Sequence, residues 1–225
     1  MSLASSISRV TGFYGRHGLA ATARRAWLAA ARTLSAGRMV VFYYDLTGDS
    51  LQKAADLGDL KVQRVSAPTE LSTSDADKIT GFWNERLATD NLRERFQRGA
   101  CLWLARLEGE LAGYGWTLQG DTIEPYYLPL TRDDIHLFDF HVFPVFRGRG
   151  VNPYLVSEIL TTLSGEGIGR AFIDVAEWNI AQLSSIRKTP LRYFGTVRSF
   201  RFLKMNFVSW KNAPREDEGA IGSKH

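Results

Sequence analysis

One segment near the middle of the chain constrains the fold more than any other. Residues 135–143 form an apolar run that predicts a strand, and Pro144 ends this strand because proline cannot continue a ladder. A basic turn with Gly148 and Gly150 follows, and helical apolar spacing begins at Tyr154. The segment therefore predicts a strand, a tight turn and the start of a helix.

The turn is a candidate anion site. Asn152 is expected to cap the helix and Pro153 to occupy its first position, where the missing N–H of proline costs nothing. Glycines lack Cβ, so an anion can approach the backbone closely, and a helix start favours phosphate through its free N–H groups and its dipole. Arg147 and Arg149 add charge-assisted hydrogen bonds. The alternative is an exposed basic turn before an ordinary capped helix.

This stretch resembles the acyl-CoA-binding motif of the GNAT acetyltransferase superfamily, Val-x-Pro-x-x-Arg-Gly-x-Gly-(Ile/Val)-(Gly/Ala). Asn152 departs from the motif, because the family usually has Gly or Ala there. The resemblance implies that the turn binds the pyrophosphate of acetyl-CoA, or of another acyl-CoA, as co-substrate and that the preceding strand pairs with the pantetheine arm. The matching residues are Val142, Pro144, Arg147, Gly148, Gly150 and Val151. The residues implied to bind the cofactor are Val142, Phe143, Arg147, Gly148, Arg149, Gly150, Val151 and Asn152.

A second, partial match lies further along the chain, where the family carries Asn-x-x-(Ser/Ala)-x-x-x-Tyr-x-Lys-x-Gly-Phe. Asn179 and Lys188 keep this spacing and are therefore added to the implied cofactor-binding residues. Gln182 stands where serine is common, and Ile186 replaces the tyrosine that protonates the leaving thiolate in many members. Tyr193 is the nearest replacement for that tyrosine. An ordinary capped amphipathic helix is the alternative interpretation of this stretch.

Acyl transfer from a thioester to an amine needs a base for the amine proton and a donor where oxyanion charge develops. The predicted central strand contains His136, Asp139 and His141, which is unusual polarity for an internal strand. Histidine is suited to proton transfer near neutral pH, and His136 lies where some family members carry a glutamate base. We predict catalytic roles for His136, Asp139 and Tyr193. Strict alternation would place His136 on the face opposite Asp139 and His141. Side chains that merely complete hydrogen bonds at a strand end are the alternative.

A polar loop over residues 120–134 mixes acidic and aromatic side chains and suits a substrate wall. Glu124, Tyr126 and Tyr127 are the expected substrate-binding residues. No metal site is expected, because the polar residues of one strand do not converge on an ion and no cysteine lies near them. A serine hydrolase is not expected either, because the sequence lacks a Gly-x-Ser-x-Gly elbow.

The order of predicted elements is that of the GNAT fold, an α/β (α+β) architecture with a central mixed sheet flanked by helices. This acyltransferase domain is expected at residues 58–211. It follows an N-terminal basic helical extension plus a strand at residues 1–57 and precedes a flexible tail at 212–225. Strands are expected near residues 39–46, 62–67, 101–107, 111–118, 135–143 and 170–176, with a closing hairpin within 191–210. Helices are expected from Ser72 through Leu87, over 91–98, after the turn, and over 179–188.

The net charge and the cysteine content limit the class of protein and its expected location. The 225-residue chain has a formal net charge of +4, which suits anionic ligands but lacks the dense basic stripe of nucleic-acid binders. Its single cysteine, Cys101, allows no intrachain disulfide, so a reducing cytoplasmic location is expected. Arginines crowd the N-terminal segment before the first acidic residue, Asp45. That segment is expected to pack as a basic helix on the main domain. A membrane-surface helix, a docking face for an acidic partner and a transit peptide are the alternatives.

Three functions stay open at this point. The leading hypothesis is an acyl-CoA-dependent N-acetyltransferase that acts on a small amine or amino sugar, or on a protein amine. The second is an acyltransferase that takes a longer chain from acyl carrier protein. The third is a non-catalytic module that binds coenzyme A without turnover, an option that Ile186 keeps open. A homodimer and a location peripheral to the membrane are also left open.

Overall fold

The computed structural model describes residues 37–48, 58–81, 85–123, 126–202 and 205–211. The expectations for the N-terminal helical segment, Glu124 and the C-terminal tail therefore lie outside the described residues. In the part of the chain that is described, no helix is long and apolar enough to cross a membrane.

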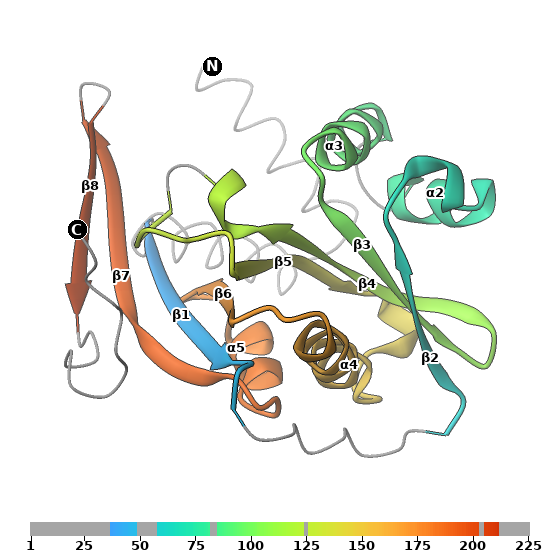
Figure 1. Cartoon of the computed structure of the whole chain (residues 1–225). Helices are drawn as coiled ribbons and strands as arrows, with labels where there is room; N and C mark the ends of the chain where they lie inside the picture. Colours follow the sequence, from blue (N-terminus) through green and yellow to red (C-terminus); the bar gives the residue numbers. More distant parts are fainter. Residues whose placement is uncertain (1–36, 49–57, 82–84, 124–125, 203–204, 212–225) are drawn as a thin grey trace, which may run out of the picture.

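An eight-stranded mixed sheet forms the centre of the molecule, as the sequence predicted (Figure 1). Its strand order is β2-β3-β4-β5-β6-β1-β7-β8, with β5 and β6 parallel and the other neighbours antiparallel. The strands are β1 (Arg38–Asp45), β2 (Leu60–Val65), β3 (Cys101–Leu107), β4 (Glu110–Gln119), β5 (Asp134–Val142), β6 (Arg170–Ala176), β7 (Arg192–Phe202) and β8 (Met205–Lys211).

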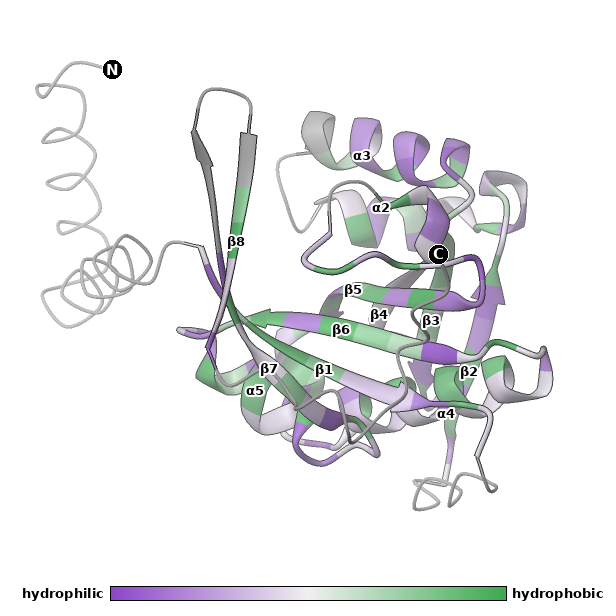
Figure 2. Ribbon diagram, turned by 60° about the vertical axis from the view of Figure 1, so that its left-hand side comes forward, coloured by the Kyte–Doolittle hydropathy of each residue, from purple (hydrophilic) through white to green (hydrophobic). Residues whose placement is uncertain are grey.

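Helices cover both faces of the sheet. In Figure 2, α2 and α3 lie above the sheet, whereas α4 and α5 lie below it. Phe96 of α3 packs on Trp116 of β4, and this contact defines the face that α2 and α3 cover. The helices are α2 (Thr73–Gly81), α3 (Glu85–Gln97), α4 (Val151–Gly165) and α5 (Ile180–Ile186). The described part of the chain also contains three short 3-10 turns: η1 (Pro68–Glu70), η2 (Gly120–Thr122) and η3 (Pro144–Phe146).

Strand β1 lies inside the sheet, between β6 and β7, and pairs antiparallel with both. This strand, predicted within the N-terminal extension, belongs to the same sheet as the strands of residues 58–211. Successive residues explain its position, because Val41 and Phe42 are both buried and belong to apolar clusters on opposite faces. A strand that is apolar on both faces is stable only as an internal strand.

The expected first helix is shorter than predicted. It was carried through Leu87, but α2 ends at Gly81 and α3 begins at Glu85, so Leu87 belongs to α3. Glycine is a poor helix former because it loses the most backbone freedom, and this favours a break near Gly81.

Candidate functional site

Strand β5 carries a bulge that changes which way its polar side chains face. Asp139 has a φ of 48°, and the pairing with β4 shifts register between Tyr114 and Trp116. A Cβ at Gly115 would lie 2.4 Å from the Phe140 ring, so the absence of a side chain there makes room for this ring. A bulge adds one residue to a strand and interrupts its alternation.

The expectation of strict alternation along β5 is therefore wrong. The Asp139 carboxylate pairs with Arg95 of α3, and the Arg95 guanidinium lies 5.3 Å from the centre of the Phe138 ring. Phe138 in turn stacks on His136, with ring centres 5.6 Å apart. Asp139 and His136 thus both lie toward α3, although Asp139 is tied to Arg95.

Strands β5 and β6 begin together and then separate. The Asp134 carboxylate accepts hydrogen bonds from Arg170 Nε at 2.7 Å and Nη2 at 2.9 Å, which joins the first residues of the two strands. Their parallel pairing covers residues 134–137 and 170–173 only, although β5 continues to Val142 and β6 to Ala176. Beyond this point each strand pairs only with its other neighbour, β4 or β1, so the edges that β5 and β6 turn toward each other can line a site.

His136 and Asp174 form a partly buried pair where the two strands separate. His136 Nε2 lies 2.7 Å from Asp174 Oδ1, and the two side chains are only 13% and 15% exposed. Asp174 was not predicted as a site residue. Its signal in the sequence is a single acidic residue inside the apolar strand β6, on the same face as Phe172.

Two tyrosines of the predicted substrate wall cover this pair. The Tyr126 ring centre lies 5.0 Å from that of His136, and the Tyr127 hydroxyl donates to Asp174 Oδ2 at 3.5 Å. Burial, followed by the charge of Asp174, raises the pKa of both hydroxyls above the ordinary tyrosine value. Both tyrosines therefore stay protonated at neutral pH.

The turn after β5 has the geometry that its glycines predicted, but the helix starts earlier than expected. Gly148 and Gly150 have φ values of 80° and 77°, a left-handed conformation that glycine adopts without steric cost. Gly150 is the N-cap residue of α4, and none of the described side chains caps this helix. The prediction that Asn152 is the cap is wrong, because the left-handed Gly150 already reverses the chain and the helix begins at Val151.

Asn152 instead connects two helices. It is the second residue of α4, and its Nδ2 donates a hydrogen bond to Ser185 Oγ of α5 at 2.7 Å. Asn179 is the residue that caps a helix here: its Oδ1 accepts a hydrogen bond from Gln182 N at 3.3 Å at the start of α5.

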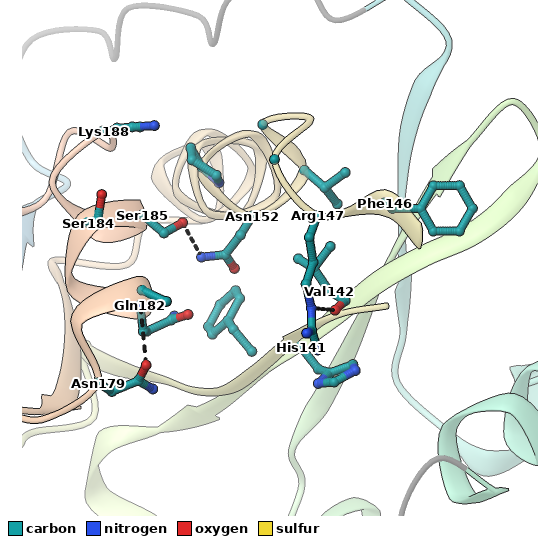
Figure 3. Close-up of a pocket in the computed structure, with 16 residues that line it drawn as sticks. His141, Val142, Phe146, Arg147, Asn152, Asn179, Gln182, Ser184, Ser185 and Lys188 are labelled. Atoms are coloured by element: carbon teal, nitrogen blue, oxygen red, sulfur yellow. Dashed lines mark hydrogen bonds between the residues drawn. The ribbon is translucent and has the colours of Figure 1, made fainter. Parts of the chain in front are cut away.

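A pocket of about 400 Å³ lies between the end of β5, the glycine turn, α4 and α5 (Figure 3). Phe143 and Arg149 do not line it: Phe143 is buried against Tyr114 and His141, and the Arg149 guanidinium lies over the Phe146 ring. The predicted cofactor-binding residues that line the pocket are Val142, Arg147, Gly148, Gly150, Val151, Asn152, Asn179 and Lys188. Lining residues that sequence reasoning missed include Phe140, Gln182, Ser184 and Ser185.

The mouth of the pocket is basic. Arg147 and Lys188 are exposed, and Arg147 Nε donates to the Val142 carbonyl at 3.1 Å, which holds its side chain against the turn. His141 also lines the pocket, and burial together with the Arg147 charge lowers its pKa below the ordinary histidine value. The positive charge at the pocket therefore comes from Arg147 and Lys188, while the lowered pKa keeps the His141 imidazole neutral at pH 7.

The predicted acid, Tyr193, lies apart from this pocket. Its side chain is 49% exposed, its hydroxyl shares a hydrogen bond with Thr196 Oγ1 at 2.9 Å, and its ring edge meets Phe42. Tyr193 does not line the pocket, and Ile186 is fully buried. Within the described residues, no group of three His, Cys, Asp or Glu side chains could hold a metal ion.

Comparison with known proteins identifies the family. The profile of the Acetyltransferase (GNAT) family matches residues 69–187, which is more than half of the chain. A search of curated proteins finds no match.

Solved structures share the fold at low sequence identity. A GCN5-related N-acetyltransferase from Sphaerobacter thermophilus has a TM-score of 0.50 and 16% identity, over 71% of this chain and 49% of that one. A tandem GNAT protein from the clavulanic acid biosynthesis pathway has a TM-score of 0.50 and 16% identity, over 70% and 50% of the two chains. The glucosamine N-acetyltransferase region of a fungal multi-domain GH3 beta-N-acetylglucosaminidase has a TM-score of 0.52 and 14% identity, over 76% and 22%.

The chain thus spans half or less of the length of these three structures, at 49%, 50% and 22%. Their likeness concerns the fold, whereas the profile match covers the strand, turn and helix that form the pocket. The protein belongs to the GNAT family of acetyltransferases.

Proposed function

We propose that this protein is an acyl-CoA-dependent N-acetyltransferase that moves an acetyl or other acyl group from coenzyme A to a primary amine. The observation that carries the proposal is the basic pocket at the uncapped start of α4. The pocket lies at the end of β5 that no longer pairs with β6, close in the chain to the His136–Asp174 pair. Donor binding and proton transfer would thus meet where β5 and β6 separate.

The pocket suits the diphosphate of coenzyme A. The first N–H groups of an α-helix have no partner within the helix, and the described residues supply no side chain that caps α4. Gly148 and Gly150 expose their backbone, and a Cβ at Gly148 would have no atom within 4 Å. Arg147 and Lys188 supply positive charge. Free backbone donors, open glycines and cations together are what an anionic diphosphate needs.

His136 is the proposed general base. Its Nε2 lies 2.7 Å from Asp174 Oδ1, and a carboxylate oxygen accepts hydrogen bonds, so Nε2 carries the ring proton. The lone pair of Nδ1 is then free to accept a proton from the substrate. Asp174 would stabilise the imidazolium that forms and hold the ring in one orientation, which makes it a positioning residue. The buried surroundings of the pair strengthen this interaction.

The proposed reaction is a direct transfer of the acyl group from sulfur to nitrogen. When bound, the acyl thioester supplies an electrophilic carbonyl carbon. His136 Nδ1 takes a proton from the amine, directly or through a water molecule, as the amine nitrogen forms the new C–N bond. The C–S bond breaks, the imidazolium of His136 returns its proton to solvent, and the sulfur leaves as a thiolate that gains a proton from solvent. Tyr193 stays a sequence prediction for that last step, since its hydroxyl is bonded to Thr196 outside the pocket.

The proposed acceptor is a small-molecule amine or amino sugar. It would approach from the face of the sheet that α2 and α3 cover, where the Tyr126 and Phe138 rings flank His136. Aromatic faces and carboxylates attract ammonium groups, and Asp139 and Asp174 both lie on this side. The structurally similar fungal region is named a glucosamine N-acetyltransferase, which is compatible with an amino-sugar acceptor.

A second candidate is an acyltransferase that uses acyl carrier protein. The observation in its favour is the exposed Arg147, Arg149 and Lys188 around the turn and pocket, which would attract an acidic carrier. Calorimetry with acetyl-CoA and with acyl carrier protein separates the two donors. A thiol-release assay across a panel of amines then tests turnover. Binding of coenzyme A without thiol release from any amine would replace the enzyme with a binding module.

A further inference from the structure

Asn152 has a hydrogen-bonded amide nitrogen, whereas its amide oxygen has no hydrogen-bond partner among the described residues. It is 7% exposed, and its Nδ2 donates to Ser185 Oγ at 2.7 Å. Its Oδ1 is fully buried and has no hydrogen-bond partner among the described residues. A buried carbonyl without a partner is costly, so such a group calls for a ligand or a bound water.

The residue that carries the free oxygen is part of the pocket wall. Asn152 lines the pocket together with Phe140 of β5 and Gln182 of α5. Figure 3 shows its amide between α5 and the end of β5, with the nitrogen turned to Ser185 and the oxygen turned the other way. In this orientation the bond to Ser185 occupies Nδ2 and leaves Oδ1 as the atom without a partner among the described residues.

A carbonyl oxygen accepts hydrogen bonds and donates none, which limits what it can recognise. Phosphate oxygens are also acceptors, so Asn152 Oδ1 cannot bind the diphosphate and would repel it at close range. The pantetheine arm, in contrast, carries amide N–H groups, and it leads from the diphosphate toward the thioester.

We infer that Asn152 Oδ1 accepts a hydrogen bond from an amide N–H of the pantetheine arm and so selects donors by that arm. Ser185 is the positioning residue that turns the oxygen into the pocket. The inference rests on the proposed function, since it assumes a pantetheine thioester in this pocket. Gly or Ala is usual at this position of the motif, so the contact would be a property of this chain rather than of the motif. Pantetheine is common to coenzyme A and to acyl carrier protein, so the recognised chemistry is shared by both donors.

Two ligands and three variants of the full chain test the inference by calorimetry. Coenzyme A carries the pantetheine arm, whereas 3′-phosphoadenosine 5′-diphosphate keeps the diphosphate and lacks the arm. Asn152→Ala should weaken the binding of coenzyme A about fivefold, which corresponds to about 1 kcal/mol, and leave the affinity for the nucleotide unchanged. Ser185→Ala should show a smaller loss with the same ligand selectivity. Thr162→Ala, an exposed position on the same helix, is the control and should change neither affinity.

Two results would overturn the inference while the proposed function stands. Unchanged affinity of Asn152→Ala for coenzyme A would mean that water alone satisfies the carbonyl. An equal loss for both ligands would mean that the residue acts through the shape of the α4 start. Failure of the wild-type protein to bind coenzyme A at all would instead overturn the proposed function, and the inference with it. Thermal melting of each variant shows that it is folded, and Ser185→Ala supplies the answer if Asn152→Ala is not.

Discussion

His136 and Asp174 come from neighbouring parallel strands, and the pairing of those strands ends between them. His136 lies within the paired part of β5, whereas Asp174 is the first residue of β6 beyond it. The hydrogen bond of 2.7 Å between His136 Nε2 and Asp174 Oδ1 therefore links the two strands at the point where their backbone pairing ends. The site therefore depends on β5 and β6 being paired at their first residues and separated at their last.

Removal of the imidazole should affect turnover more than binding. For His136→Ala we expect kcat to fall about 10²- to 10⁴-fold, the usual contribution of a general base, with little change in KM for acetyl-CoA. Steady-state kinetics across pH measures this. Thr162→Ala, an exposed position on α4, is the control and should leave kcat unchanged. Equal pH–rate profiles for His136→Ala and wild type would remove His136 from the mechanism.

Replacement of the positioning carboxylate should have a distinct signature. Asp174→Asn keeps the size of the side chain but no longer stabilises an imidazolium, so kcat should fall while the affinity for acetyl-CoA is retained. Steady-state kinetics measures kcat, and calorimetry measures the affinity for acetyl-CoA. A wild-type kcat in Asp174→Asn would mean that Asp174 serves only its hydrogen bond with Tyr127.

Substitutions in the glycine turn should weaken the binding of acetyl-CoA rather than turnover. Arg147→Ala combined with Gly150→Val should lower the affinity for acetyl-CoA tenfold or more, or about 1.4 kcal/mol or more. The arginine supplies charge to the pocket, and a β-branched residue is strained at the φ of 77° that Gly150 adopts. Calorimetry measures the affinity. Tight binding by the double variant would show that the diphosphate lies elsewhere.

The stability of the fold should depend on Asp75 below pH 4. Asp75 is 5% exposed and accepts hydrogen bonds from Arg106 and Ser72. Burial raises the pKa of this carboxyl, but these two partners outweigh it, and the pKa lies below the ordinary value of 3.8. The stabilisation is therefore complete above that value and is lost as the pH falls through the lower folded-state pKa.

Asp75→Asn should lower the free energy of unfolding at pH 7 by about 1–3 kcal/mol, since it removes a charge from a mostly buried hydrogen-bonded pair. The variant should also lose less stability than wild type as the pH falls below 4. Urea unfolding at several pH values measures both effects. Parallel pH curves for the two proteins would contradict the assignment of this pKa shift to Asp75.

His141 should produce a pH dependence in a different range. Burial and the Arg147 charge lower its pKa, so the unfolded chain binds more protons than the folded one just below the ordinary histidine value of 6.5. Wild-type stability should therefore fall as the pH drops from 7 toward 5, and His141→Phe should flatten this slope. Phenylalanine preserves the ring contact with Tyr114. A slope unchanged by the substitution would assign it to other groups.

The sequence predicted what depends on local chemistry and missed what depends on distant contacts. Apolar runs and turn residues are local, and they placed β3 and β6 at their observed bounds and the glycine turn before α4. The position of β1 depends on pairing with β6 and β7 far along the chain, which no local pattern encodes. Its continuous apolar character was a usable sign of an internal strand.

The functional side chains divide in the same way. His136 was found because it is polar in an apolar strand, but its partner Asp174 lies 38 residues away and meets it only through the parallel pairing. The bulge at Asp139 depends on the room that Gly115 leaves for Phe140 on a neighbouring strand, so alternation misassigned the faces of β5. Asn152 has good capping chemistry, but Gly150 already supplies the left-handed residue that starts the helix.

A crystal structure of the protein with coenzyme A would test the proposed donor site most directly. The diphosphate should lie on the backbone N–H groups of residues 148–152, with Arg147 and Lys188 beside it and the sulfur toward the point where β5 and β6 separate. A diphosphate bound away from these N–H groups, in crystals that do contain coenzyme A, would contradict the proposed site.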